Sequence, residues 1–411
     1  MICTRKQVPQ NAAKLILLYC ADTTEPDTEA GLSVKSRRGG TTLVHEGVRI
    51  PIYGAVATFP GSRFAPVAEA STAEPAAFAG SSGNRTVLRI GYDLFKETDH
   101  ILRAGQPAAN AESATLDLHI ALLRDLITKS GIPIVEIPPV PEGHSFIVCL
   151  THDIDHPVLR NHCCDHTMVG FLYRAMIGTV INVCRGRKSF RDLRTNWTAA
   201  LMLPFVYLGM TKDFWRGFDR YVEMEAGLTS TYFVIPTRDC PGRPFVGNGV
   251  SRRAARYDVT DVGPQLRKVL SSGCEVGLHG IDAWVDSSKG CEERDRVTQT
   301  LGETVTGVRT HWLFFDEKTP AVLERAGFSY DSTVGYNETV GYRAGTAQVY
   351  KLLGTANLLE LPLHIMDTAL FYPNHLNLSD EDAERMVRKF IDRAAEFGGV
   401  LTFNWHDRSI A

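Results

Sequence analysis

The residues best suited to chemistry stand in the segment Thr-His-Asp-Ile-Asp-His at positions 151–156. Its two carboxylates, two residues apart, permit a division of roles, with Asp153 as a general base and Asp155 as a ligand for a divalent metal. A metal would polarise an amide carbonyl and lower the pKa of a water molecule. Because an amide nitrogen is a poor leaving group, a general acid is also needed, and His406 is the natural candidate. These residues indicate metal-assisted hydrolysis.

Short apolar runs with the length of strands precede these residues and recur along the chain. The runs occupy residues 146–151, 230–235, 275–279, 307–311, 328–332, 358–363 and 400–405. Helical patterns separate several of them, at residues 262–271, 320–326 and 380–397. The last of these patterns follows Ser379, a good N-cap, and ends at a Gly-Gly pair. Repeated alternation of strand and helix predicts a parallel α/β barrel or a doubly wound sheet.

Polar residues gather where these predicted strands end. His279, Arg309, His311 and Asp331 do so, as does His406. Because the C-terminal ends of barrel strands converge on one face, we expect these side chains to share a pocket with the acidic segment. A single histidine is best explained as a structural residue, but common placement at strand ends favours the catalytic interpretation. A carboxylate with imidazole ligands suits Zn²⁺ and tolerates other first-row metals.

Composition narrows the class of protein. The 411 residues carry a formal net charge of -3 with both signs interspersed, which argues against a nucleic-acid-binding surface. The nine cysteines include no C-x-x-C pair, as expected for buried, reduced thiols in a cytosolic protein. Residues 1–10 are polar and lack the apolar core of a signal peptide. We expect a soluble cytoplasmic protein without stable membrane insertion, and leave a homo-oligomer open.

The chain divides into two parts by composition. The first part shows a strand at residues 12–20, a loop rich in small residues at 60–86, a strand running into a turn at 86–95 and an amphipathic helix at 114–130. A proline-rich stretch at residues 132–141 then marks a domain boundary. We expect a smaller α/β domain of unknown role at residues 1–141, and a barrel at 142–411 with a helical insertion around 157–228.

Within that insertion, residues 168–183 form an apolar run followed by Arg-Gly-Arg-Lys at 185–188. Basic residues suit the C-terminus of a helix, so a helix packed on the barrel is the favoured interpretation. Docking of the run on a membrane surface is the alternative.

Five segments carry a resemblance to a known family. They are residues 150–155, 273–280, 307–309, 326–332 and 401–406. In this order they resemble the motifs of the NodB-like polysaccharide deacetylases, carbohydrate esterase family 4, over residues 145–407. The resemblance implies a distorted (β/α)7 barrel, a divalent metal and N-deacetylation of an acetamido sugar. Residues 90–95 are similar to an uncharacterised α/β domain that precedes some of these barrels.

The resemblance also implies roles for single residues. Asp155 and His279 bind the metal, and Arg309 orients the base aspartate. His406 is the general acid, and Asp331 fixes its tautomer. In the cytoplasm the substrate would be a nucleotide-linked or lipid-linked sugar precursor.

The chain departs from the family pattern at one metal ligand. A second histidine is expected four residues after His279, and Ala283 stands there. Three explanations are open: His311 replaces it, Asp282 replaces it, or the site holds metal weakly or not at all. We favour His311 and Zn²⁺. The departure keeps two alternative functions open, a metal-independent hydrolase of a small cyclic amide and an inactive carbohydrate-binding barrel.

Three tryptophans lie next to motif residues, Trp284, Trp312 and Trp405. Aromatic faces stack on sugar rings, so all three are candidate substrate contacts, although core packing explains at least one of them equally well. The sequence shows no helix after His406 that would close the barrel. We therefore expect either a truncated end or coverage of that side by the first domain or a partner subunit.

Overall fold

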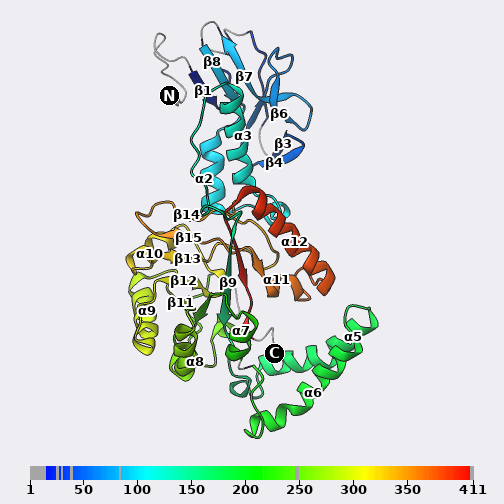
Figure 1. Cartoon of the computed structure of the whole chain (residues 1–411), viewed down its shortest axis with the longest axis vertical. Helices are drawn as coiled ribbons and strands as arrows, with labels where there is room; N and C mark the ends of the chain where they lie inside the picture. The colour runs from blue at the N-terminus through cyan, green and yellow to red at the C-terminus, as the bar shows by residue number, and fades with distance from the viewer. Residues whose placement is uncertain are drawn as a thin grey trace. The chain divides into compact units, whose positions relative to one another are not determined.

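The computed structural model describes residues 15–24, 27–28, 31–37, 40–82, 85–215, 217–245 and 250–407. The chain forms two compact units (Figure 1). The first contains residues 1–142 and the segment 342–347, and the second contains residues 143–341 and 348–411. The start of the first expected strand, residues 12–14, lies outside the described residues, as does Cys3. The domain roles expected from the sequence stay predictions.

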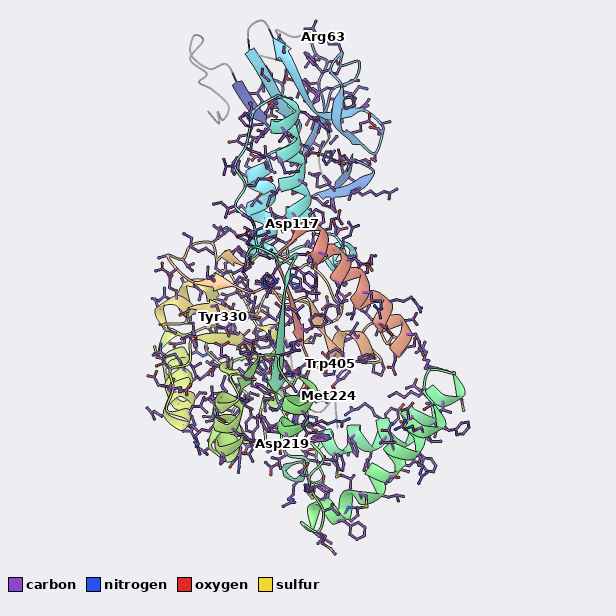
Figure 2. All side chains as sticks on the ribbon, viewed as in Figure 1. Arg63, Asp117, Asp219, Met224, Tyr330 and Trp405 are labelled. Atoms are coloured by element: carbon purple, nitrogen blue, oxygen red, sulfur yellow. The ribbon has the colours of Figure 1, made fainter. Side chains whose placement is uncertain are left out.

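The first unit is built on a six-stranded sheet in the order β1-β8-β7-β6-β3-β4. Its strands are β1 (Leu15–Tyr19), β3 (Thr41–His45), β4 (Val48–Ile52), β6 (Pro66–Ala70), β7 (Pro75–Ser82) and β8 (Arg85–Ile90). A small sheet pairs β2 (Lys35–Arg37) with β5 (Val56–Thr58). Two helices accompany the sheets, α2 (Leu94–Ala104) and α3 (Thr115–Lys129). The segment 342–347 joins this unit because Thr346 donates a 2.6 Å hydrogen bond to Asp117 of α3, which Figure 2 labels.

The loop expected at residues 60–86 is wrong, because the strands β6 and β7 lie within it. The small residues that suggest a loop are here packed inside a sheet, with Ala76 and Ala77 fully buried. Pro66 and Pro75 each stand first in their strand, a position where the missing backbone N–H is tolerated. The composition of this segment therefore gave a wrong prediction, because β6 and β7 are stabilised by pairing with a strand on each side.

The second unit is built on a nine-stranded sheet in the order β14-β15-β13-β12-β11-β10-β9-β17-β16. Its strands are β9 (Ile147–Ile154), β10 (Ser230–Val234), β11 (Glu275–Gly280), β12 (Gly307–Thr310), β13 (Tyr330–Asp331), β14 (Tyr350–Lys351), β15 (Leu359–Glu360), β16 (Ile365–Met366) and β17 (Val400–Asn404). All pairs are parallel except β14 with β15. Each of the seven expected runs overlaps one of these strands.

Helices alternate with the strands of the second unit (Figure 1). They include α8 (Val259–Ser271), α9 (Ser287–Leu301), α10 (Thr319–Arg325), α11 (Asp367–Phe371) and α12 (Asp380–Phe397). The start of α12 is set as the sequence predicts, since the Ser379 hydroxyl accepts a 3.1 Å hydrogen bond from the backbone of Asp382. Buried aliphatic and aromatic side chains of β10, β11 and α8 form the main core between sheet and helices.

The insertion after β9 is helical, as predicted. A continuous helical stretch runs through α4 (His166–Leu172), η3 (Tyr173–Gly178), which has π-helical geometry, and α5 (Thr179–Cys184). It is followed by α6 (Phe190–Tyr207) and α7 (Phe218–Met224). Residues 166–184 are long and apolar enough to cross a membrane by length and composition alone, yet only 17% of that window is buried in the protein. The favoured prediction of a helix packed on the barrel is therefore wrong for most of its surface.

The cysteines are unpaired wherever the structure describes them. Cys163, Cys164 and Cys184 are exposed, and the other five described cysteines are half-buried. The expectation of buried thiols is therefore wrong, since none of the described cysteines is buried and most of them stand in turns or beside strands.

Candidate active site

Parallel pairing brings the predicted site residues to one end of the sheet. Strand β9 lies between β10 and β17, with Asp153 opposite Phe233. Strands β11 and β12 lie beside each other, with His279 opposite Arg309. Asp155, His311 and His406 each follow within two residues of the end of their strand. Because all these strands run in the same direction, their C-terminal ends converge as the sequence predicts.

Asp153 is held from both sides. Its Oδ1 accepts a 2.9 Å hydrogen bond from Nη1 of Arg309, and its Oδ2 accepts a 2.7 Å bond from Nδ2 of Asn404. Arg309 is itself fully buried and donates to the carbonyl oxygen and the hydroxyl of Ser332. Its guanidinium also lies over the ring of Phe233, 4.4 Å from the centroid. The carboxylate therefore has a fixed position and a permanent positive partner.

The charges around Asp153 keep it ionised. Burial alone would raise the pKa of this carboxyl, but His279 and Arg309 outweigh that effect, and the pKa lies below its ordinary value. A carboxylate that is ionised and partly shielded can accept a proton from a bound water molecule. This geometry fits the predicted role of general base.

Asp155, His279 and His311 form a group of possible metal ligands. Oδ1 of Asp155 lies 3.4 Å from Nε2 of His279 and 3.6 Å from Nε2 of His311. Two ligand atoms bound tetrahedrally at the usual Zn²⁺ distances lie about 3.4 Å apart. The two distances from Asp155 therefore match the edges of a tetrahedral site, and the two imidazole nitrogens lie within 4.8 Å of each other.

The protonation of these side chains also fits a metal. The Nδ1 atom of His279 lies 2.9 Å from the carbonyl oxygen of Arg309, and a proton donated there leaves Nε2 with its lone pair directed at Asp155. Burial lowers the pKa of His311 to about 3, so this imidazole is neutral, as a ligand must be. Oδ1 of Asp155 is buried and has no hydrogen-bond partner among the described residues. A cation at this point would satisfy an atom that is otherwise unpaired.

His406 lies next to the same carboxylate, with Nε2 3.7 Å from Oδ2 of Asp155. Its Nδ1 lies 2.5 Å from Oδ1 of Asp367, and its backbone N–H donates to the other oxygen of that residue. Burial would lower the pKa of His406, but Asp367 raises it to about 9. The imidazole is therefore charged and oriented, as a general acid requires.

The prediction that Asp331 fixes the tautomer of His406 is wrong, because Asp367 makes that contact. Asp331 instead accepts a hydrogen bond from the hydroxyl of Thr333 and lies opposite Glu360 on the neighbouring strand. Burial and the nearby carboxyl of Asp331 raise the pKa of Glu360 well above its ordinary value. The side chain of Asp331, at the end of β13, is therefore buried beside Glu360. The sequence motif alone does not reveal this position.

A cavity of about 360 Å³ opens over the metal-ligand group. Its lining includes Asp153, Asp155, His279, His311 and His406 together with Trp312, Phe314, Asn337, Met366, Thr368, Tyr372 and His375. Five of the predicted polar residues thus reach one solvent-accessible space. A second cavity of about 240 Å³ shares Asp155, His311, Trp312 and Tyr372 with the first and adds the cations Arg174, Arg252 and Arg253.

The three predicted tryptophans lie in different surroundings. Trp312 is 41% exposed and lines the cavity. Trp284 is buried between Phe245 and Phe314 and is absent from the described lining, so its surroundings are those of a core residue. Trp405 is half-buried and lines a separate groove beside α6 and α11; Figure 2 labels it.

The position expected to hold the family's second histidine is closed. Ala283 is fully buried in the main core, and its Cβ lies close to where a side chain on Gly280 would stand. Asp282, the other predicted replacement, turns away and accepts a 2.7 Å hydrogen bond from the backbone of Arg243. Of the two replacements, the structure brings only His311 to Asp155 and His279.

Two contributors escaped the sequence analysis, Asn404 and Asp367. Asn404 alternates with Thr402 and His406, so a strict two-residue period placed it on the same face of β17 as the predicted acid. Asp367 begins the short helix α11, a segment for which the sequence offers no motif. Asn404 could therefore have been predicted from the sequence, and Asp367 could not.

Comparison with protein-family models found no match, and comparison with curated proteins found none either. Solved structures similar to this chain include one described as a polysaccharide deacetylase from Mycobacterium smegmatis, with 16% identity, a TM-score of 0.37, and coverage of 67% of this chain and 82% of the other. Another, from Pseudomonas aeruginosa PAO1 and also described as a polysaccharide deacetylase, has 12% identity, a TM-score of 0.39, and coverage of 69% and 85%.

A third similar structure is a family 4 acetyl xylan esterase from Clostridium thermocellum in complex with a cobalt ion. It has 11% identity, a TM-score of 0.23, and coverage of 62% of this chain and 87% of the other. With TM-scores below 0.5, these likenesses do not by themselves identify the activity of this chain, which has to be inferred from its site.

Proposed function

We propose that this chain is a metal-dependent hydrolase of non-peptide carbon–nitrogen bonds that removes the acetyl group from an acetamido sugar. One observation carries the proposal. Asp155, His279 and His311 are spaced as metal ligands, and they share a cavity with Asp153 and His406. Amide hydrolysis needs a general base, a general acid and a Lewis acid around the same substrate, and this cavity offers candidate residues for all three roles.

The proposed proton transfers follow from the contacts. Asp153, held by Arg309 and Asn404, takes a proton from the attacking water as its oxygen bonds to the acetyl carbon. The carbon–nitrogen bond then breaks, and His406 gives its Nε2 proton to the leaving amine. Asp367 keeps the imidazole oriented and charged until that step. Acetate and an amino sugar leave the site.

The residues present fit a divalent cation, and Asp155, His279 and His311 would hold it. An imidazole–imidazole–carboxylate set is typical of Zn²⁺ sites that keep a position open for substrate or water. When bound, such an ion supplies the Lewis acidity that polarises an amide carbonyl and makes a water more acidic. The hydrogen bond from His279 to the backbone of Arg309 would keep that ligand in its metal-binding tautomer.

The mouth of the cavity suits a sugar. Trp312 and Tyr372 offer aromatic surface, and Asn337 and His375 offer polar groups. Trp312 has a positive φ of 64°, which is uncommon for a residue with a side chain and indicates that its position is held by the surrounding structure. We therefore propose Trp312 as the main sugar contact. Trp405 lies in the neighbouring groove and is a contact only for a longer substrate.

The proposal includes several points that come from the sequence. They are a distorted barrel of seven strand–helix repeats, a cytoplasmic location, and a carbohydrate substrate without a nucleic-acid partner. His311, as a candidate third ligand, supports the metal-dependent reaction over a metal-independent cyclic-amide hydrolase. The same ligand and the oriented His406 disfavour an inactive carbohydrate-binding barrel.

Metal analysis of the purified full-length chain, combined with acetate release from acetylated chito-oligosaccharides, tests the proposal. We expect about one bound zinc per chain, and release of acetate that is lost with a chelator and restored by Zn²⁺. Release of acetate without bound metal would favour the metal-independent hydrolase. Neither metal nor acetate, with binding of the oligosaccharide, would favour the inactive barrel.

The choice of third ligand is tested separately by metal content. His311→Ala should lower the affinity for Zn²⁺ by at least about tenfold, because one of three protein ligands is lost. His119→Ala is the matched control, since it removes a buried imidazole from the first unit, where Nδ1 of His119 lies 2.8 Å from the hydroxyl of Tyr92. Equal zinc content in the two variants would show that His311 is not a ligand.

A further inference from the structure

The helical insertion forms a hairpin that the proposed reaction does not use. We define the hairpin as residues 166–210. Its first arm is the continuous helix of α4, η3 and α5, and its second arm is α6. Figure 1 shows α5 and α6 running side by side away from the sheet of the second unit, and contacts between them agree with that view.

One side of the hairpin is packed in the usual way. Leu203 and Val206 of α6 are buried with Leu159 and Trp215, and Phe171 and Leu172 of the first arm pack against this cluster. Across the two arms, the side-chain amide of Asn196 donates a 2.8 Å hydrogen bond to the hydroxyl of Thr179. The hairpin is therefore a folded element, with a defined inner and outer side.

The outer side is apolar to a degree that is unusual for a protein surface. On the first arm the exposed apolar residues outside the groove beside α11 are Val169, Met176, Ile177, Val180 and Ile181, which recur at intervals of four and seven and so form one helical stripe. On the second arm they are Phe190, Trp197, Leu201, Phe205 and Leu208. Leu208 is 72% exposed and Phe190 is 79% exposed. Contiguous apolar surface of this kind marks a binding surface.

The charge of the hairpin is opposite to that of the chain. Its cations are Arg174, Arg185, Arg187, Lys188, Arg191 and Arg194, and Asp192 is its only acidic residue. The whole chain carries a net charge of -3, so the basic character belongs to this element and not to the protein. Five of the six cations lie between residues 185 and 194, where the two arms meet. Exposed apolar stripes beside clustered cations complement an anionic lipid surface.

Other occupants fit the same surface less well. A membrane span is disfavoured because Arg174 stands midway along the first arm and because Thr179 is buried and bonded to the second arm. A second copy of the chain would bring the same cluster of cations against itself, which is unfavourable. A lipid surface needs only the outer side and leaves the packed inner side intact.

We propose that the hairpin of residues 166–210 seats this protein on the surface of an anionic membrane. The apolar stripes enter the interface between headgroups and acyl chains, and Arg185, Arg191 and Arg194, which lie where the arms meet and outside the lining of the groove beside α11, pair with anionic headgroups. The hairpin begins at residue 166, after the segment that leaves β9 at residue 154, so it belongs to the same end of the sheet as Asp155. Arg174 of the first arm lines the cavity of about 240 Å³ that Asp155 also lines. Docking therefore occurs beside the candidate site, although the proposal does not depend on the reaction there.

Co-sedimentation of the full-length chain with lipid vesicles tests the proposal. The protein should bind vesicles of phosphatidylcholine and phosphatidylglycerol in equal amounts, and binding should weaken as salt is added because headgroup charges are screened. Arg185→Glu/Arg191→Glu/Arg194→Glu should bind at least about a hundredfold more weakly. Leu201→Ser/Leu208→Ser should bind at least about tenfold more weakly, because it removes side chains from the outer side alone.

The matched control is Arg385→Glu/Arg388→Glu/Lys389→Glu on α12, which makes the same change of net charge on an exposed helix outside the hairpin. It should bind vesicles as the unchanged chain does, and circular dichroism should show equal folding of all variants. Failure of the unchanged chain to bind these vesicles would overturn the proposal. So would equal loss in the control, or protein that stays in the membrane after washing with high salt and carbonate, which indicates a span. Light scattering that shows a dimer lost in the serine variant, without vesicle binding, would assign the surface to a second copy.

Discussion

The second unit buries two pairs of carboxyl groups under similar conditions but with opposite consequences. Asp153 and Asp155 are 2% and 7% exposed, and Asp331 and Glu360 are not exposed at all. Each pair lies near the C-terminal ends of the parallel strands. In the first pair the pKa of each carboxyl is lowered, and in the second pair it is raised.

Neighbouring charges explain the difference, because burial favours the neutral acid in both pairs. The first pair faces the fixed cation of Arg309 and the charged imidazole of His406, with the polar imidazoles of His279 and His311 beside them. In the second pair, Asp331 and Glu360 chiefly face each other, with the Thr333 hydroxyl and the backbone N–H of Val334 as further partners. Burial therefore does not identify a catalytic carboxylate, whereas the neighbouring cations that keep the carboxylate charged do identify it.

Substitution of the base should have the largest effect on activity. Asp153→Asn keeps the shape of the side chain but removes the group that accepts the proton, so kcat/KM for acetate release should fall by at least about a thousandfold. Asp282→Asn is the matched control, because that carboxylate neighbours the site and its one hydrogen bond among the described residues comes from the backbone of Arg243. An Asp153→Asn variant with more than about a tenth of the activity would remove this residue from the reaction.

Removal of the cation should have the largest effect on stability. Arg309→Met leaves Asp153 as a buried charge without its partner, which should lower the free energy of unfolding by about 3–5 kcal/mol, measured by urea denaturation. Arg309→Met/Asp153→Asn removes the charge as well and should recover part of that loss. If the double variant is no more stable than the single one, Arg309 stabilises the fold by packing on Phe233 and through Ser332, and the comparison between the two pairs loses its physical basis.

The strands of the second unit were predictable because each is a short apolar run between helical patterns. Residues 146–151 and 400–405 contain most of β9 and β17, and α12 begins and ends where its capping residues predict. The strands β6 and β7 were missed because their stability comes from pairing with neighbours, which a composition of small residues does not reveal. The exposure of residues 166–184 was also missed, since an apolar helix reads the same whether it is packed or not.

The site was predictable where strand ends impose the geometry. Asp153, Asp155, His279 and His406 meet because parallel strands share a direction, and the position of His311 follows from the same rule. The partner of His406 was not predictable in this way. Both Asp331 and Asp367 are acidic and precede it in the chain, and only the turn from β16 into α11 decides which of them reaches the imidazole.

That partner gives the next prediction. Asp367→Asn removes the charge that raises the pKa of His406, so the imidazole should lose its proton at lower pH. The alkaline limb of the pH–rate profile should move down by at least about one unit, with a smaller change at low pH where His406 stays protonated. Asp331→Asn should leave the limb in place. A limb that moves with Asp331→Asn and not with Asp367→Asn would reverse the assignment.

The smallest effect should come from the second pair, and it concerns stability alone. The pKa of Asp331 is raised from 3.8 to about 7, chiefly by burial, so the folded chain holds a proton that the unfolded chain has released. The stability that this proton provides is complete at low pH and is lost as the pH rises through about 7, with a slope of at most about 1.4 kcal/mol per pH unit. Glu360→Gln keeps an oxygen to accept from the backbone of Val334 and offers an amide N–H to Asp331, so part of this slope should disappear.

Urea denaturation of Glu360→Gln and the unchanged chain between pH 5 and 8 measures the difference. Some slope should remain, because burial also raises the pKa of Glu293 to about 7 and gives a change of the same sign. Acetate release should not change, because Asp331 and Glu360 are not in the described lining of the cavity. Equal slopes would mean that the two carboxyls do not share a proton. Lost activity in a fully folded variant would mean that the second pair also supports the reaction. Its effect would pass through Arg309, which bonds to both Ser332 and Asp153. The charged catalytic pair and the neutral structural pair would then not be separate.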